Sequence, residues 1–155
     1  MSIMEKFKLD GKTALVTGCS KGIGFGIAKG LAEAGADIIG VSSTLDIGSE
    51  IEKYVESIGR RFHCFSCDFS KRQNTHNFLK ELGKNNLEPN ILVSNAGSLI
   101  RTELNEHNDA HWDRRLEINL SSQIVLAREL SSKMIERGWG KIIFTASILS
   151  HQGGL

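Results

Sequence analysis

Short runs of apolar residues alternate along the whole chain with longer stretches in which apolar residues recur at helical spacing. The apolar runs predict strands over residues 12–16, 37–41, 62–66, 91–93 and 142–144. The stretches between them predict helices, among them residues 23–34, 49–58, 74–82 and 116–134. The strands are apolar without alternation, which is typical of a parallel sheet covered by helices on both faces. The pattern therefore predicts one doubly wound α/β domain, or part of one, over residues 1–155.

The longest predicted helix contains one polar residue that does not fit its surroundings. Its apolar stripe consists of Leu116, Leu120, Ile124, Ala127, Leu130 and Met134. Asn119 lies inside this stripe, between Ile118 and Leu120. A buried amide that lacks hydrogen bonds costs about 1–3 kcal/mol, so we expect Asn119 to be buried and hydrogen-bonded. It could be a hydrogen-bonded core residue without further role, but its placement indicates a functional one.

A glycine-rich turn follows the first predicted strand and precedes a helix. It reads Thr17-Gly18-Cys19-Ser20-Lys21-Gly22-Ile23-Gly24. Glycine lets the backbone turn sharply and approach a ligand closely, and the helix N-terminus offers free N–H groups to phosphates. Strand, glycine turn and helix together predict a dinucleotide-binding site. The alternative is a tight turn between strand and helix that binds nothing.

Three other positions follow predicted strands, at the sheet edge where ligands of such folds bind. Asp68 follows the third strand and could accept a hydrogen bond from the exocyclic amine of adenine; alternatively it is a helix N-cap. Asn95-Ala96-Gly97 follows the fourth strand, where small residues let the chain pass a cofactor and Asn95 can brace the turn; alternatively it is an ordinary loop. Ser147 follows the fifth strand, where its hydroxyl could meet a carbonyl or alcohol oxygen.

Composition narrows the possible functions. The net charge is +1 without basic or acidic blocks, so we expect neither nucleic acid nor membrane as a partner. No secretory signal is visible, which predicts a cytoplasmic protein whose three cysteines are reduced. Cys64 and Cys67 lie along a predicted strand and point to opposite faces, which argues against a redox pair, and no further ligands at metal spacing accompany them. We therefore expect no metal site.

The motifs in this order resemble the short-chain dehydrogenase/reductase family, over essentially the whole chain. The resemblance implies a Rossmann-type sheet, of which this chain holds the N-terminal five strands, and hydride transfer between an alcohol and a ketone. It implies the cofactor-binding residues Gly18, Ser20, Lys21, Gly22, Ile23, Gly24, Ser43, Asp68, Phe69, Asn95, Ala96 and Gly97. It implies the catalytic residues Ser147, which polarises the substrate oxygen, and Asn119, which supports a water relay. It also implies a homo-oligomer, a tetramer or a dimer.

The chain departs from the family pattern in two places. Ser94 stands where family members usually carry a second Asn before Asn-Ala-Gly. The general acid/base motif Y-x-x-x-K is missing, and the only tyrosine is Tyr54, in the second predicted helix. We therefore expect an N-terminal portion of a dehydrogenase that is inactive by itself. The alternative is a noncatalytic dinucleotide-binding or interaction protein that has lost its acid/base residues.

Finer resemblance concerns the substrate and the cofactor. Leu99-Ile100-Arg101, Trp112-Asp113 and residues 140–150 are similar to sugar-acid dehydrogenases of the 2-deoxy-D-gluconate 3-dehydrogenase type, also named 2-dehydro-3-deoxy-D-gluconate 5-dehydrogenase. Gluconate 5-dehydrogenase is the alternative. Arg101 could pair with a substrate carboxylate, or it is a surface charge. The second strand ends in Ser42-Ser43-Thr44 rather than an acidic residue, and Lys21 could favour a 2′-phosphate. The resemblance implies NAD, with NADP as the other possibility.

Overall fold

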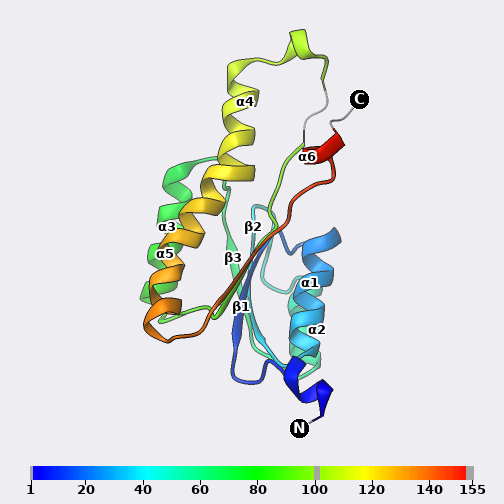
Figure 1. Ribbon diagram of the computed structural model, residues 1–155, viewed down its shortest axis with the longest axis vertical. Helices are drawn as coiled ribbons and strands as arrows, with labels where there is room; N and C mark the ends of the chain where they lie inside the picture. Colours follow the sequence, from blue (N-terminus) through cyan, green and yellow to red (C-terminus); the bar gives the residue numbers. More distant parts are fainter. Residues whose placement is uncertain (1, 100–101, 153–155) are drawn as a thin grey trace.

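The computed structural model describes residues 2–99 and 102–152, which form a five-stranded parallel sheet between two layers of helices (Figure 1). The strands are β1 (Thr13–Thr17), β2 (Asp37–Ser42), β3 (Phe62–Ser66), β4 (Ile91–Ser94) and β5 (Lys141–Phe144). Their order in the sheet is β3-β2-β1-β4-β5. Strands β2 and β3 therefore lie on one side of β1, and the chain then crosses over to place β4 and β5 on the other side. The predicted doubly wound α/β fold is confirmed.

The helices cover both faces of the sheet, as the apolar strands require. Helices α1 (Gly22–Glu33) and α2 (Glu50–Ser57) lie on one face, and α3 (Arg72–Lys84) and α5 (Ser122–Glu136) lie on the other. Helix α4 (Asp109–Leu116) continues the line of α5 beyond the carboxyl ends of the strands (Figure 1). Two 3₁₀ helices, Ile3–Phe7 and Leu104–Glu106, and the short α6 (Leu149–Gln152) complete the elements described.

Each face of the sheet has its own apolar core. Ala14, Val16 and Ile38 pack against α1 and α2, whereas Leu15 and Ile39 pack against α3 and α5. Cys64 contacts the first core and Cys67 belongs to the second, so these two thiols lie on opposite sides of the sheet, as predicted. All three cysteines are free. Burial of the apolar side chains on both faces of the sheet drives its formation.

The long predicted helix is broken, and the first part of its predicted apolar stripe is wrong. Residues Glu117–Ser121 form a π-helical turn between α4 and α5, and a π turn takes more residues per turn than an α-helix. Leu116, Leu120 and Ile124 are 39%, 56% and 52% exposed. The polar residues Ser122 and Gln123 are buried in their place. They tolerate burial because the Ser122 hydroxyl donates to the carbonyl of Ile118 and the Gln123 amide donates to that of Ala96.

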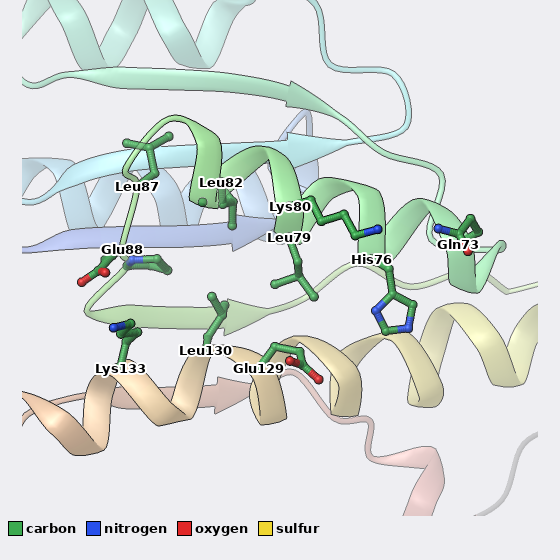
Figure 2. A pocket seen from close by; sticks show the side chains of 12 residues that line it. Gln73, His76, Leu79, Lys80, Leu82, Leu87, Glu88, Glu129, Leu130 and Lys133 are labelled. Carbon is green, nitrogen blue, oxygen red and sulfur yellow. The ribbon is translucent and has the colours of Figure 1, made fainter.

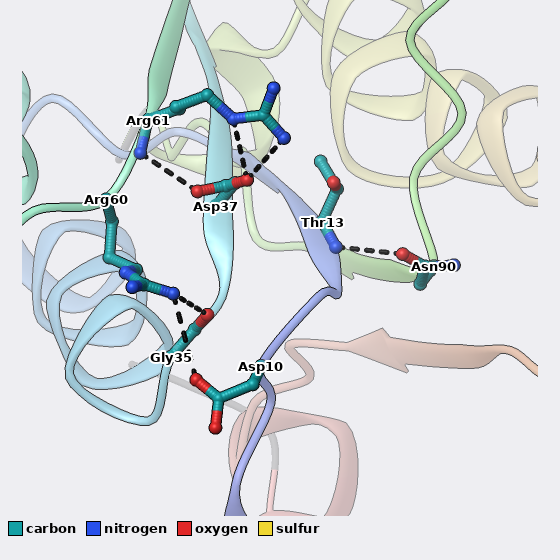
Figure 3. A network of polar contacts seen from close by, with 7 residues as sticks. All are labelled: Asp10, Thr13, Gly35, Asp37, Arg60, Arg61 and Asn90. Carbon is teal, nitrogen blue, oxygen red and sulfur yellow. Dashed lines mark hydrogen bonds and ion pairs between the residues drawn. The ribbon is translucent and has the colours of Figure 1, made fainter.

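Polar contacts fasten the amino ends of the strands (Figure 3). The Arg61 guanidinium donates to Asp37 Oδ2 through Nε at 2.9 Å and Nη2 at 2.7 Å, and the Arg61 backbone N–H donates to Asp37 Oδ1 at 2.9 Å. Asn90 Oδ1 accepts from the backbone N–H of Thr13 at 2.8 Å. These bonds join β1 to the loop before β4, and β2 to the loop before β3. The opposite, carboxyl ends of the strands are left for the candidate site.

Two smaller features differ from the sequence prediction or qualify it. Ser49, the first residue of the helix predicted over 49–58, is the N-cap of α2, but its side chain makes no capping hydrogen bond. Strand β5 lies at the edge of the sheet, and its apolar residues Ile142, Ile143 and Phe144 are 37–50% exposed.

Among the described residues, no helix is long and apolar enough to cross a membrane.

Candidate dinucleotide-binding site

A cleft of about 400 Å³ opens at the carboxyl ends of the first four strands, where the chain crosses from one half of the sheet to the other. Ligands of open α/β sheets bind at such a crossover. Many of the predicted cofactor residues line it: Gly18, Ser20, Lys21, Ser43, Asp68, Phe69, Asn95, Ala96 and Gly97. Sequence reasoning did not assign six further lining residues to the site: Ser42, Thr44, Cys67, Ser98, Arg114 and Ile118. The fold therefore brings four separate loops to one cleft.

The glycine turn has the backbone that a phosphate cradle requires. Gly18 and Gly22 have φ angles of +69° and +58°, which side chains disfavour. A β-carbon on Gly24 would lie 2.2 Å from the carbonyl oxygen of Gly18, so only glycine lets the helix begin this close to the turn. Helix α1 begins at Gly22, its N-cap Lys21 makes no side-chain capping bond, and its first turn holds no acidic residue. Its first N–H groups have no intrahelical partner and favour an anion.

Three predicted residues of this turn do not line the cleft itself. Gly22, Ile23 and Gly24 form the first turn of α1, directly after the lining residue Lys21. Ile23 is 69% exposed. A β-carbon on Gly22 would meet nothing within 4 Å, so there is open space beside the first residue of the helix. These residues contribute backbone N–H groups rather than side chains.

Asn95 braces the turn between β1 and β4. The backbone N–H groups of Asn95 and Ala96 both donate to Thr17 Oγ1 at 2.8 Å. The Asn95 side-chain amide donates to the carbonyl of Thr17 at 3.1 Å, and its Oδ1 accepts from the Thr145 hydroxyl at 3.3 Å. One side chain therefore ties together the carboxyl ends of β1, β4 and β5. This is not the arrangement of an ordinary solvent-exposed loop.

Asp68 has a conformation that leaves it facing the cleft. The alternative interpretation of Asp68 as a helix N-cap is wrong, because Lys71 is the N-cap of α3. Asp68 Oδ1 instead accepts from the backbone N–H of Ser70 at 3.0 Å. Hydrogen bonding from Ser70 lowers the pKa of Asp68, and the charges of Arg114 and Lys71 lower it further against the opposing effect of burial. The carboxylate is therefore ionised at neutral pH and available as an acceptor.

Asn119 is hydrogen-bonded as predicted but exposed rather than buried. Its Oδ1 accepts from the backbone N–H of Ser98 at 2.8 Å, and its Nδ2 donates to the Ser98 carbonyl at 3.0 Å. The amide oxygen and the amide nitrogen of Asn119 both bond to the backbone of Ser98, so the side chain has its hydrogen-bond partners although it is not buried. Asn119 and Gln123 together hold the loop after β4 against the helix; sequence reasoning missed Gln123, because its partner Ala96 is distant in the chain.

Ser147 is not a lining residue of the cleft. It lies in the exposed segment between β5 and α6, and its hydroxyl accepts from the Leu149 backbone N–H at 3.2 Å. The catalytic role of Ser147 and Asn119 stays a prediction. Arg101 lies outside the described residues.

Two buried cysteines lie at this site, Cys19 in the glycine turn and Cys67 in the lining of the cleft. Burial raises the pKa of both Cys19 and Cys67 to about 12. A thiolate is the reactive form of cysteine, so these buried thiols are poor nucleophiles. Within residues 2–99 and 102–152, no group of three or more His, Cys, Asp or Glu side chains is arranged to hold a metal ion.

A larger cavity, of about 570 Å³, lies between α3 and α5, away from the strand ends (Figure 2). Leu79, Leu82 and Leu130 form its apolar floor. Three of its charged lining residues are engaged in ion pairs: Lys133 with Glu136, Glu88 with Arg137, and Glu129 with Arg128. The cavity lies away from the carboxyl ends of the strands, where ligands of open α/β sheets bind, so the cleft at the strand ends is the better candidate site.

Comparisons with known proteins agree with this geometry. The family model described as short chain dehydrogenase matches residues 12–155. The 2-dehydro-3-deoxy-D-gluconate 5-dehydrogenase of Pseudoalteromonas atlantica is 52% identical over 99% of this chain and 61% of its own length. The enzyme of the same name from Bacillus subtilis is 46% identical over 97% of this chain and 59% of its own length.

A solved structure shows the same fold. The 3-oxoacyl (acyl-carrier-protein) reductase of Agrobacterium tumefaciens, with NADP bound, superposes with a TM-score of 0.91 at 28% identity, over 99% of this chain and 59% of its own. The chain thus spans about 60% of the length of these relatives. With a family model matched from β1 to the last residue, and the crossover cleft in place, the chain belongs to the short-chain dehydrogenase family.

Proposed function

We propose that this chain binds a nicotinamide dinucleotide, NAD or NADP, in the cleft at the carboxyl ends of β1–β4. The observation that carries the proposal is the glycine turn, which presents an open helix N-terminus to the cleft. Gly22 has a φ of +58° and open space where a β-carbon would stand, and the first N–H groups of α1 have no intrahelical partner, so the residues present fit a phosphate group held by backbone N–H groups. Asp68 and Phe69 lie where they could hold the adenine ring.

The ribose end of the cleft favours neither cofactor by charge alone. Ser42, Ser43 and Thr44 line it with neutral hydroxyl groups, and Lys21 adds a cation nearby. An acidic residue in this place would repel a 2′-phosphate, and the two cleft residues directly after β2, Ser43 and Thr44, are not acidic. The hydroxyl groups suit the free ribose of NAD, the cofactor that the family resemblance favours. The A. tumefaciens reductase was solved with NADP, so both cofactors belong in the assay.

The whole protein's reaction is, in this proposal, the interconversion of a secondary alcohol and a ketone on a sugar acid. The P. atlantica and B. subtilis relatives are named for such a substrate. The dinucleotide supplies hydride chemistry when bound. Ser147 hydrogen-bonds the substrate oxygen, and Asn119 holds the loop after β4 while supporting proton transfer through water. The substrate is of the 2-deoxy-D-gluconate or 2-dehydro-3-deoxy-D-gluconate type.

Glycine replacement with a matched control tests the binding site. Gly22→Val adds a branched side chain at the first residue of the helix, and Gly48→Val makes the same change at φ +82° with the same open space but outside the cleft. Both variants carry the same kind of backbone strain. We expect Gly22→Val to weaken NADH and NADPH binding at least about tenfold in calorimetry, through lost phosphate contacts worth about 1.4 kcal/mol or more. Equal affinities for the two variants would refute the proposal.

Turnover separates binding from catalysis. The single tyrosine, Tyr54, lies in α2, donates to Glu33 and is not a cleft residue, so the described residues place no tyrosine at the cleft to act as general acid. General acid–base groups contribute about 10²–10⁴-fold to rate. We therefore expect residues 1–155 to bind the dinucleotide without oxidising 2-deoxy-D-gluconate. Turnover comparable to that of the B. subtilis enzyme would show that the assigned roles are wrong.

The implied homo-oligomer and cytoplasmic location belong to the same proposal. Leu116, Leu120 and Ile124 form an exposed apolar strip on α4, the π turn and α5 that supports self-association. Light scattering of the purified protein, with Leu120→Ser as the variant, measures whether this strip is buried between copies.

A further inference from the structure

Two ion pairs join the β3–α3 segment to α4 and the π turn, and both members of one pair, Asp68 and Arg114, line the cleft. Arg114 Nη2 lies 4.0 Å from Asp68 Oδ1. Four residues after Asp68 and three residues after Arg114, Arg72 donates to Glu117 through Nε at 2.6 Å and Nη2 at 2.8 Å. In the β3–α3 segment the acidic Asp68 precedes the basic Arg72, whereas along α4 and the π turn the basic Arg114 precedes the acidic Glu117. Opposite charges therefore face one another at both positions.

The two pairs differ in kind. Arg72–Glu117 is bidentate, and the Glu117 side chain is only 17% exposed, so this pair anchors the π turn to the start of α3. Arg114 and Asp68 are 49% and 39% exposed, and 4.0 Å is too long for a hydrogen bond. The Arg114 guanidinium therefore lies beside Asp68 at the cleft, and its N–H groups make no hydrogen bond to that carboxylate. Arg114 itself lines the cleft, together with Asp68, Phe69 and Ile118.

A planar cation at this position suits an aromatic base. Guanidinium groups stack on aromatic faces, and a neighbouring carboxylate can accept from an exocyclic amine. Ile118 supplies an apolar surface one turn beyond Arg114. We propose that Arg114 binds the adenine half of the dinucleotide through its guanidinium, and that the Arg72–Glu117 pair positions it. This inference rests on the proposed dinucleotide-binding function.

Substitution of Arg114 tests the contact. Arg114→Gln removes the charge, and Arg114→Lys keeps the charge but removes the plane. Arg128→Gln is the matched control, because Arg128 is an exposed arginine on α5 that pairs with its neighbour Glu129 outside the cleft. We expect both Arg114 variants to bind NADPH and 5′-AMP about three- to fivefold more weakly, as a partly exposed cation–π contact predicts, and the control to bind like wild type. Thermal melting of each variant reports whether it folds.

The results distinguish this inference from the proposed function. If the wild-type chain binds neither NADPH nor NADH, the proposed function is wrong. If the wild type binds and both Arg114 variants stay within twofold of it, or if the loss affects NADPH but not 5′-AMP, the role of Arg114 is wrong. Unaltered binding by Arg114→Lys alone overturns the stacking contact.

Glu117 tests the positioning role. Glu117→Gln weakens the bidentate pair without touching the lining of the cleft. Because Glu117 acts through Arg114, its loss weakens 5′-AMP binding in the wild type but adds nothing in an Arg114→Gln background. Additive losses in the double variant would overturn the positioning role, since they would show that Glu117 acts by another route.

Discussion

The hydroxyl of Thr17 connects the end of β1 to the cleft, and its removal gives a sharp test of the site's architecture. Thr17 is 1% exposed. Its Oγ1 accepts from the backbone N–H groups of Asn95 and Ala96, and lies 3.5 Å from the carbonyl of Val93, to which it donates. Thr17→Val replaces this oxygen with a methyl group of similar size. The shape of the core is kept while two backbone donors lose their acceptor.

The expected loss follows from these two donors. A buried donor left without a partner costs about 1–3 kcal/mol. Asn95 and Ala96 are half-buried, so the low end applies to each, and the variant loses about 2 kcal/mol in the free energy of unfolding. The same change frees the loop after β4, so cofactor affinity falls together with stability.

Urea unfolding with a complementary variant measures this loss. Thr17→Ser keeps the hydroxyl and removes only the methyl group, which costs about 1 kcal/mol of apolar burial. We expect Thr17→Val to be the less stable of the two and Thr17→Ser to retain dinucleotide binding. A Thr17→Val variant as stable as wild type, with an unchanged denaturant slope, would refute the idea that this hydroxyl holds the loop.

Two further predictions concern other parts of the fold. Gly24→Ala should lower the thermal midpoint and abolish dinucleotide binding because its β-carbon meets Gly18 at 2.2 Å, whereas Gly26→Ala, in open space within the same helix, should be neutral or stabilising. Burial alone would raise the pKa of Asp37, but hydrogen bonds and charge from Arg61 outweigh it and the pKa is lowered. Ionised Asp37 therefore stabilises the fold above about pH 4 and ceases to do so as the pH falls through its lower folded pKa; urea titrations between pH 2 and 6 should show this acid-dependent loss reduced in Asp37→Asn.

The sequence by itself determined the elements and most of the cleft. The strand predicted over 62–66 has those bounds, and the other strands differ by a residue or so at their ends. The glycine turn, Asp68 and Asn95 are recognisable because each follows a strand, and parallel strands end at the same edge of the sheet. Local periodicity and strand direction are enough for these inferences.

Only the tertiary structure decided how the long helix is broken and which of its residues meet the cleft. Hydrophobic spacing predicted a buried stripe through Leu120 and Ile124, yet Ser122 and Gln123 are buried instead. Hydrogen bonds make the difference, because the Ser122 hydroxyl donates to the carbonyl of Ile118 one turn earlier, and the Gln123 amide donates to the carbonyl of Ala96, which is distant in the chain. The approach of Arg114 to Asp68 likewise depends on how α4 is placed over the strand ends. The local pattern indicates which residues prefer burial. The fold brings polar groups together with their hydrogen-bond partners, and this determines which polar groups can be buried.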